Sequence, residues 1–130
     1  MTTDSFEKLR MWQVGHRFVL SVYRATAHFP DVEKFGLVTQ FRRAAVSITA
    51  NIAEGYKKLG KADKLRFFNI SQGSLEECRN YIILSRDLGY INKSENDELF
   101  VGLEETSKVM NAYCAAIVEN KAIKDNFLTS

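Results

Sequence analysis

Three helix-breaking points divide this chain into four long segments. Pro30 disfavours helical backbone in the residue before it, and Gly60 and Gly89 suit the left-handed conformation in which helices often end. The chain has one proline and seven glycines in 130 residues, too few for the many turns of a multi-stranded sheet. The pattern therefore predicts an all-α protein. Its helices are expected over residues 11–29, 35–58, 62–88 and 93–121.

The short connections between these segments determine how the helices pack. About four to six residues join consecutive helices, which makes them antiparallel neighbours. At 130 residues, with 45% hydrophobic and 26% charged residues, the chain has the size and composition of one globular domain. We therefore expect an antiparallel up-and-down four-helix bundle that forms a single domain over residues 1–130.

The first residues of the chain do not resemble a secretion signal. No basic segment there precedes an apolar run, and no stretch approaches the roughly 18 apolar residues that a spanning helix needs. We therefore expect a cytoplasmic protein that does not contact a membrane.

The residue types that carry catalysis or bind metals form no recognisable motif. His16 and His28 lack the glutamate three residues earlier that a di-metal helical bundle requires. Cys78 and Cys114 are expected about 15 Å apart along neighbouring helices, too far for a disulfide, and we interpret both as small core residues. The sequence therefore predicts a non-enzymatic protein with no cofactor and no metal. A metal or small-molecule enzyme is the least favoured alternative.

The first predicted helix carries more apolar surface than one core requires. Its apolar residues spread over about 240°, roughly twice the width of a core-facing stripe. Exposed apolar surface of this extent usually marks a protein interface. We therefore predict self-association through this helix, and the alternative is a deeply embedded helix in a monomer. The predicted interface residues are Val14, Phe18, Leu20 and Val22.

Polar residues border the apolar stripe of the second predicted helix. Arg43, Ser47, Asn51 and Glu54 recur at spacings of three or four residues, which places them along one flank. Counted from the following turn, Arg43 and Glu77 lie at the same height on adjacent helices, so we predict that they pair. One interpretation of this flank is a buried polar or metal site. The favoured interpretation is a set of ion pairs and hydrogen bonds that fix the helix register.

Basic residues give the clearest functional signal. Residues 1–66 hold 12 Lys or Arg against 6 Asp or Glu, whereas residues 67–130 hold 6 against 10. Spaced cations can follow a phosphate backbone, and the alternative is a solvated charged face. Aromatic residues do not alternate with these cations, which favours sequence-tolerant contact over base stacking. The candidate nucleic-acid-binding residues are Arg10, Arg17 and Arg24 in the first helix, and Lys57, Lys58, Lys61, Lys64 and Arg66 around the turn between the second and third helices.

Motifs in three of the segments resemble a known family. Residues 42–55 read Arg-Arg-Ala-Ala-Val-Ser-Ile-Thr-Ala-Asn-Ile-Ala-Glu-Gly, residues 73–77 read Gly-Ser-Leu-Glu-Glu, and residues 6–13 read Phe-Glu-Lys-Leu-Arg-Met-Trp-Gln. These motifs resemble the four-helix-bundle proteins encoded in intervening sequences of bacterial large-subunit ribosomal RNA genes. Thr49 stands where that family usually carries proline, so we expect a straighter helix here.

The resemblance implies partners but no catalytic residues. Members of the family look like homopentameric rings, and more distant relatives serve as accessory proteins of reverse transcriptases in retroelements and present basic surfaces to RNA. We therefore expect a homo-oligomer, as a pentamer, that binds RNA or a ribonucleoprotein partner such as a reverse transcriptase. The alternative is an oligomeric protein-interaction scaffold without nucleic-acid binding, in which the basic and acidic halves serve only subunit contact.

Overall fold

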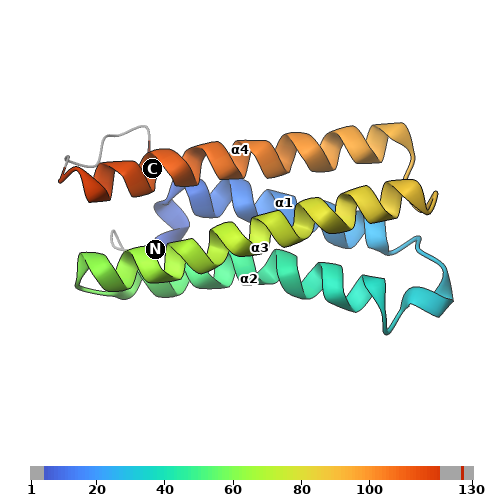
Figure 1. Ribbon diagram of the computed structural model, residues 1–130, viewed down its shortest axis with the longest axis horizontal. Coiled ribbons are helices and arrows are strands. Elements are labelled where there is room, and N and C mark those ends of the chain that lie inside the picture. Colours follow the sequence, from blue (N-terminus) through green and yellow to red (C-terminus); the bar gives the residue numbers. More distant parts are fainter. Residues whose placement is uncertain (1–4, 121–126, 128–130) are drawn as a thin grey trace.

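Four long helices dominate the structure, a computed structural model that describes residues 5–120 and 127 (Figure 1). Two short 3-10 helices precede the first two long ones, and no strand occurs among the described residues. Within the same residues, no helix combines the length and hydropathy needed to span a membrane. The all-α prediction is confirmed, and each predicted helix matches an observed one to within a few residues. The elements are η1 (Phe6–Lys8), α1 (Arg10–Thr26), η2 (Asp31–Glu33), α2 (Leu37–Lys57), α3 (Lys61–Asp87) and α4 (Lys93–Val118).

Local sequence explains several of the helix ends. The Asn92 side chain accepts the Glu95 N–H at 2.8 Å, and the Glu95 carboxylate accepts the Asn92 N–H at 2.9 Å, a reciprocal cap at the start of α4. Gly89 follows α3 with a φ of 79°, a left-handed conformation that glycine adopts without strain. Gly60 does not adopt the predicted left-handed conformation. Its φ is −89°, and it forms the N-cap of α3.

Neighbouring helices run in opposite directions. Along α2 and α3, Ile48 contacts Ser71 while the earlier Phe41 contacts the later Tyr81. The same reversal relates α1 to α4 and α3 to α4. The result is a bundle in which each helix packs against two neighbours (Figure 1).

The bundle core absorbs most of the apolar surface of α1. Val14, Phe18 and Val22 each expose no more than 3% of their surface, because α1 packs against both α2 and α4. The prediction that these three residues form an oligomer interface is therefore wrong, because the core of the bundle buries them. Among the four predicted interface residues, Leu20 alone is exposed, at 44%.

Helices α2 and α3 approach each other closely through small residues. A Cβ atom placed on Gly55 would lie 2.6 Å from Cε1 of the buried Phe68 ring. The buried Ser71 hydroxyl donates to the Ile48 carbonyl at 2.8 Å. Helix α2 continues without interruption through Thr49. We call the contact between α2 and α3 the α2–α3 seam.

Candidate nucleic-acid interface

The turn between α2 and α3 lies at one end of the bundle, at the left of Figure 1. Its residues include a cluster of cations. Helix α2 ends at Lys57 and α3 begins at Lys61, so the last turn of one helix and the first turns of the other lie side by side. This places all members of the second predicted basic cluster around a single tip. We call this cluster the basic turn; its members are Lys57, Lys58, Lys61, Lys64 and Arg66.

Lys64 differs from its neighbours because its ammonium group points toward the protein backbone. Its Nζ donates to the Tyr56 carbonyl at 2.7 Å and to the Gly55 carbonyl at 3.4 Å, both in the last turn of α2, where carbonyls lack the usual intrahelical partners. The Gly55 carbonyl also accepts the Lys58 N–H at 3.2 Å. Burial lowers the pKa of the Lys64 ammonium. Lys64 therefore caps α2 and is the weakest phosphate-binding candidate in the basic turn.

An aromatic ring lies inside the basic turn. The Lys58 ammonium is 5.0 Å from the centroid of the Phe67 ring, and the Arg66 guanidinium carbon is 4.6 Å from it. Contacts of this kind contribute about 0.5–1 kcal/mol at exposed sites. The expectation that aromatic residues stand apart from these cations is therefore wrong. The turn between the helices brings Lys58 close to Phe67, which directly follows Arg66 in the sequence. Leu59, at the tip, is fully exposed.

The arginine row of α1 faces acidic residues of α4. Arg17 lies 3.5 Å from Glu105 and Arg24 lies 3.4 Å from Glu98. Each pair is largely exposed, so it contributes little to stability, but it cancels charge locally. The structure thus pairs two of the three predicted phosphate-binding arginines within the chain. The third, Arg10, lines a hollow of the α1–α4 surface together with Phe127.

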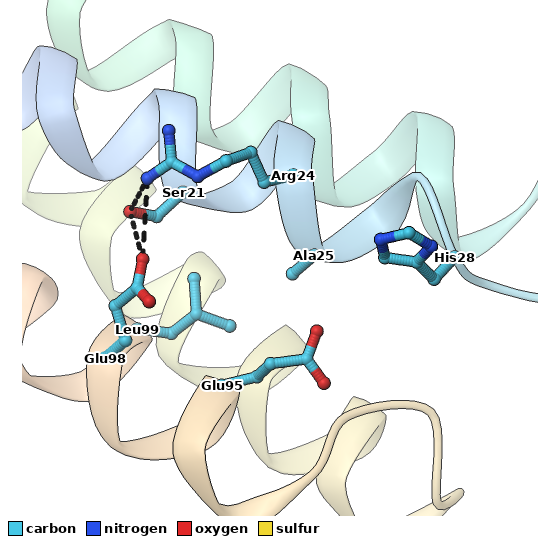
Figure 2. A pocket seen from close by; sticks show the side chains of 7 residues that line it. All are labelled: Ser21, Arg24, Ala25, His28, Glu95, Glu98 and Leu99. Atoms are coloured by element: carbon cyan, nitrogen blue, oxygen red, sulfur yellow. Dashed lines mark hydrogen bonds and ion pairs between the residues drawn. The ribbon is translucent and has the colours of Figure 1, made fainter.

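A small hollow of about 130 Å³ lies beside Arg24, between α1 and α4. Figure 2 shows His28 and Glu95 on its two sides, while Glu98 accepts hydrogen bonds from Ser21 at 3.0 Å and from Arg24 at 3.4 Å. Among the described residues, no group of three or more His, Cys, Asp or Glu is arranged to hold a metal ion. The hollow therefore contains Ser21, Arg24 and Glu98 joined by hydrogen bonds, beside the exposed His28.

The predicted polar flank of α2 divides into two parts, of which the first belongs to the α2–α3 seam. The Asn51 amide donates to the Ser47 carbonyl at 2.8 Å and to the Ser47 hydroxyl at 3.1 Å. Ser74 of α3 donates to the same hydroxyl at 2.8 Å. The Ser74–Ser47 bond links the two helices at a fixed height and supports the register-fixing interpretation for Ser47, whereas both Asn51 bonds lie within α2 and orient the Asn51 side chain on Ser47.

The second part of the flank points away from α3. Arg43 is exposed and lines a groove with Tyr23 and Val46, whereas Glu77 accepts a hydrogen bond from Tyr81 at 3.1 Å. The predicted Arg43–Glu77 pair is therefore wrong. Counting along the helices gave the right height but did not determine which way each side chain faces. Glu54 is exposed and forms no ion pair with the described residues.

Arg42 has a structural role that the sequence pattern did not indicate. Its Nε donates to the Thr26 hydroxyl at 2.8 Å and its Nη2 donates to the Tyr23 carbonyl at 3.3 Å. The guanidinium also stacks on the Tyr23 ring at 4.4 Å. The two adjacent arginines of the family motif thus have separate roles, because Arg42 closes the end of α1 and Arg43 remains at the surface.

Both cysteines are free thiols with little nucleophilic character. Cys78 is buried, as predicted for a core residue, and Cys114 is half-buried. Burial raises the pKa of both thiols, and the neighbouring Glu77 carboxylate raises the pKa of Cys78 further. A thiol with a raised pKa stays protonated at neutral pH and does not act as a nucleophile.

An open groove of about 650 Å³ lies on the surface of α3 and α4, and Arg66 of the basic turn is among its lining residues. Within its lining, the Gln72 amide donates to the Asn111 side-chain carbonyl at 2.7 Å and so links α3 to α4. The sequence did not predict this groove, because its amides come from two helices and no single-helix spacing reveals them. We call it the amide groove; it is lined by Leu65, Arg66, Asn69, Gln72, Asn111 and Cys114.

Comparison with known proteins assigns the family. The model of the 23S rRNA-intervening sequence protein family matches residues 7–112, which cover α1, α2, α3 and most of α4. No curated protein matches the chain. Because the match covers well over half of the chain and includes the motifs of α2 and α3, this protein belongs to the family of 23S rRNA-intervening sequence proteins.

Proposed function

We propose that this protein is a non-enzymatic, homo-oligomeric helical bundle that binds RNA, or a ribonucleoprotein partner, through the basic turn. One observation carries the proposal, namely that cations from the end of α2 and the start of α3 surround a single exposed tip. Lys58 and Arg66 are held on the Phe67 ring, and Lys61 is exposed. Cations grouped in this way contact phosphates and make binding sensitive to salt.

The start of α3 adds to the attraction for anions. Gly60 is the N-cap and supplies no side chain to the first N–H groups of α3. Such groups, together with the positive end of the helix dipole, favour negative ligands. Asp63 opposes this effect in the first turn, although it lies 3.9 Å from Arg66. The lysines of the basic turn therefore remain the main source of its attraction for anions.

Self-association is the second part of the proposal. Leu20, Tyr23 and Val46 are each about 40% exposed, and Tyr23 and Val46 line one groove of about 530 Å³ between α1 and α2. Exposed apolar side chains beside a groove favour protein contact. A symmetric oligomer repeats the basic turn, so that weak phosphate contacts add up through multivalency. The pentamer comes from the family resemblance.

Sedimentation equilibrium tests this part. We expect a mass several times the 14.8 kDa of one chain, and five times that mass for a pentamer. Replacing Val46 with glutamate should lower the assembly state and leave helicity unchanged, because this side chain is exposed in the single chain. A monomer at micromolar concentration contradicts self-association.

Salt-dependent filter binding tests the RNA part. Structured RNA should bind wild-type protein at about 50 mM salt, and the logarithm of affinity should fall with the logarithm of salt by about 0.9 per phosphate contact. The triple variant Lys58→Gln, Lys61→Gln and Arg66→Gln should show a slope shallower by about 2–3. A matched control carries the same charge change at the opposite end of the bundle, as Lys34→Gln, Arg86→Gln and Lys93→Gln, and should retain the wild-type slope.

The alternative function is an oligomeric scaffold that recognises protein. Leu59 favours it, because a fully exposed apolar side chain at the centre of the basic turn gains nothing from phosphate contact. Counterion release favours binding most at low salt. If the wild-type oligomer does not retain RNA at about 50 mM salt, the protein-scaffold alternative replaces the RNA-binding proposal.

A further inference from the structure

We infer that the amide groove receives an unpaired nucleobase of RNA whose phosphates contact the basic turn. This inference rests on the proposed function and specifies the form of RNA that the protein recognises. It predicts that bases as well as phosphates contribute to binding.

The amide groove and the basic turn form one continuous surface. Arg66 belongs to both, since it contacts Phe67 at the turn and lines the start of the groove. Arg66, Asn69 and Gln72 follow at intervals of three residues and therefore share one face of α3. A strand bound by phosphate at the turn lies next to this face, and its bases can enter the groove.

The side chains in the groove offer both donors and acceptors. The hydrogen bond between Gln72 and Asn111 at 2.7 Å occupies one group of each amide and leaves each with its other group available. Asn69 is exposed and has both groups available to a ligand. Every nucleobase carries donors and acceptors on its edges, and asparagine and glutamine recognise such edges. Because the Gln72–Asn111 bond links α3 to α4, it restrains these two side chains before a base arrives.

The rest of the lining suits the flat, uncharged face of a base. Leu65 and Cys114 are half-buried in the groove, and burial raises the pKa of the Cys114 thiol, so that it remains neutral. Among the described residues that line the groove, none is a carboxylate. The hollow beside Arg24, by contrast, contains Glu95 and Glu98. Of these two sites, the amide groove is therefore the one compatible with a polyanion.

The test compares RNA with and without bases. Fluorescence anisotropy with full-length protein would use a labelled 12-nucleotide single strand, the same backbone with abasic sites at its central positions, and a duplex of the same length. Side-chain amides that hydrogen-bond to a base edge strengthen binding, so the intact strand should bind at least about fivefold more tightly than the abasic strand. It should also bind more tightly than the duplex, whose bases are paired.

Variants then locate the effect. Asn69→Ala with Asn111→Ala should abolish the difference between intact and abasic strands and leave the salt slope unchanged. Asn80→Ala is the matched control, because Asn80 is an exposed asparagine of α3 outside the groove, and it should retain the difference. Circular dichroism should show that all variants keep their helicity.

Two failures are distinguishable. If intact and abasic strands bind equally, with the salt dependence of the basic turn intact, the nucleobase inference is wrong and the proposed RNA binding stands. If wild-type protein binds none of the three RNAs at about 50 mM salt, the proposed function fails and the inference fails with it.

Discussion

Helices α2 and α3, and helices α1 and α4, are both pairs of antiparallel neighbours, yet different chemistry joins them. The α2–α3 seam is built from small residues and neutral hydrogen bonds, such as the approach of Phe68 to Gly55 and the bond from Ser71 to Ile48. The outer edge of the α1–α4 contact carries ion pairs, including the one between Arg24 and Glu98.

The contrast shows that the spacing of charges does not by itself define a binding surface. The arginines of α1 recur regularly in the sequence, but the fold places acidic residues of α4 against two of them. At the end of the α2–α3 pair, Lys58 lies on the Phe67 ring, and Arg66 lies on the same ring and 3.9 Å from Asp63. Regular spacing therefore indicates a candidate surface, and the fold determines which of its cations lie beside a carboxylate.

Replacing Gly55 with alanine is the most direct way to break the α2–α3 seam. The new Cβ would lie 2.6 Å from the buried Phe68 ring and 3.0 Å from the Phe67 Cβ, so we expect a loss of about 1–3 kcal/mol in the free energy of unfolding. Urea denaturation monitored by circular dichroism measures it. Gly73→Ala is the matched control: no neighbouring atom lies within 4 Å of the position that its Cβ would take, and it should stabilise α3 by about 0.5–1 kcal/mol. Equal midpoints for both variants would contradict the close approach.

Replacing Ser71 with alanine removes one buried hydrogen bond from the same seam. The Ser71 side chain is fully buried and donates to the Ile48 carbonyl, so we expect a loss of about 0.5–1.5 kcal/mol in the free energy of unfolding. Ser94→Ala, at an exposed position of α4, provides the comparison in the same denaturation experiment. An unchanged midpoint for Ser71→Ala would show that this bond contributes nothing to the seam.

Breaking the ion pairs of the α1–α4 contact should have the smallest effect. Arg17→Gln and Arg24→Gln should each lower the free energy of unfolding by about 0.2–1 kcal/mol, because their side chains are about two-thirds exposed. The loss should shrink as salt is raised from low to physiological concentration. A loss as large as that of Gly55→Ala, unchanged by salt, would overturn the contrast between the two contacts.

The sequence predicts most of the fold because the helix ends are local features. The single proline, the glycines and the cap formed by Asn92 and Glu95 depend only on nearby residues, and they locate all four helices. The wide apolar arc of α1 was ambiguous, since a helical wheel counts apolar residues but not the neighbours that cover them. Val14 and Leu20 were therefore predicted alike, although one is buried and the other exposed.

The candidate site could be predicted only in part, for a related reason. Lys57 to Lys61 cluster in the sequence itself, so the basic turn was evident. The Gln72–Asn111 contact joins residues far apart in the chain, and the placement of Lys58 on the Phe67 ring depends on the geometry of the turn. These two contacts depend on how two helices lie relative to each other, and the residue pattern within one helix does not contain that information.

The hydrogen bonds from Lys64 to the end of α2 have a thermodynamic consequence for any ligand of the tip. They attach the first turn of α3 to the last carbonyls of α2, and the contacts of Lys58 and Arg66 with Phe67 restrict two further side chains. Long side chains lose about 0.5–1.5 kcal/mol of conformational freedom each when a partner immobilises them. Because the fold has already restricted these groups, their ordering subtracts less from the affinity of the complex.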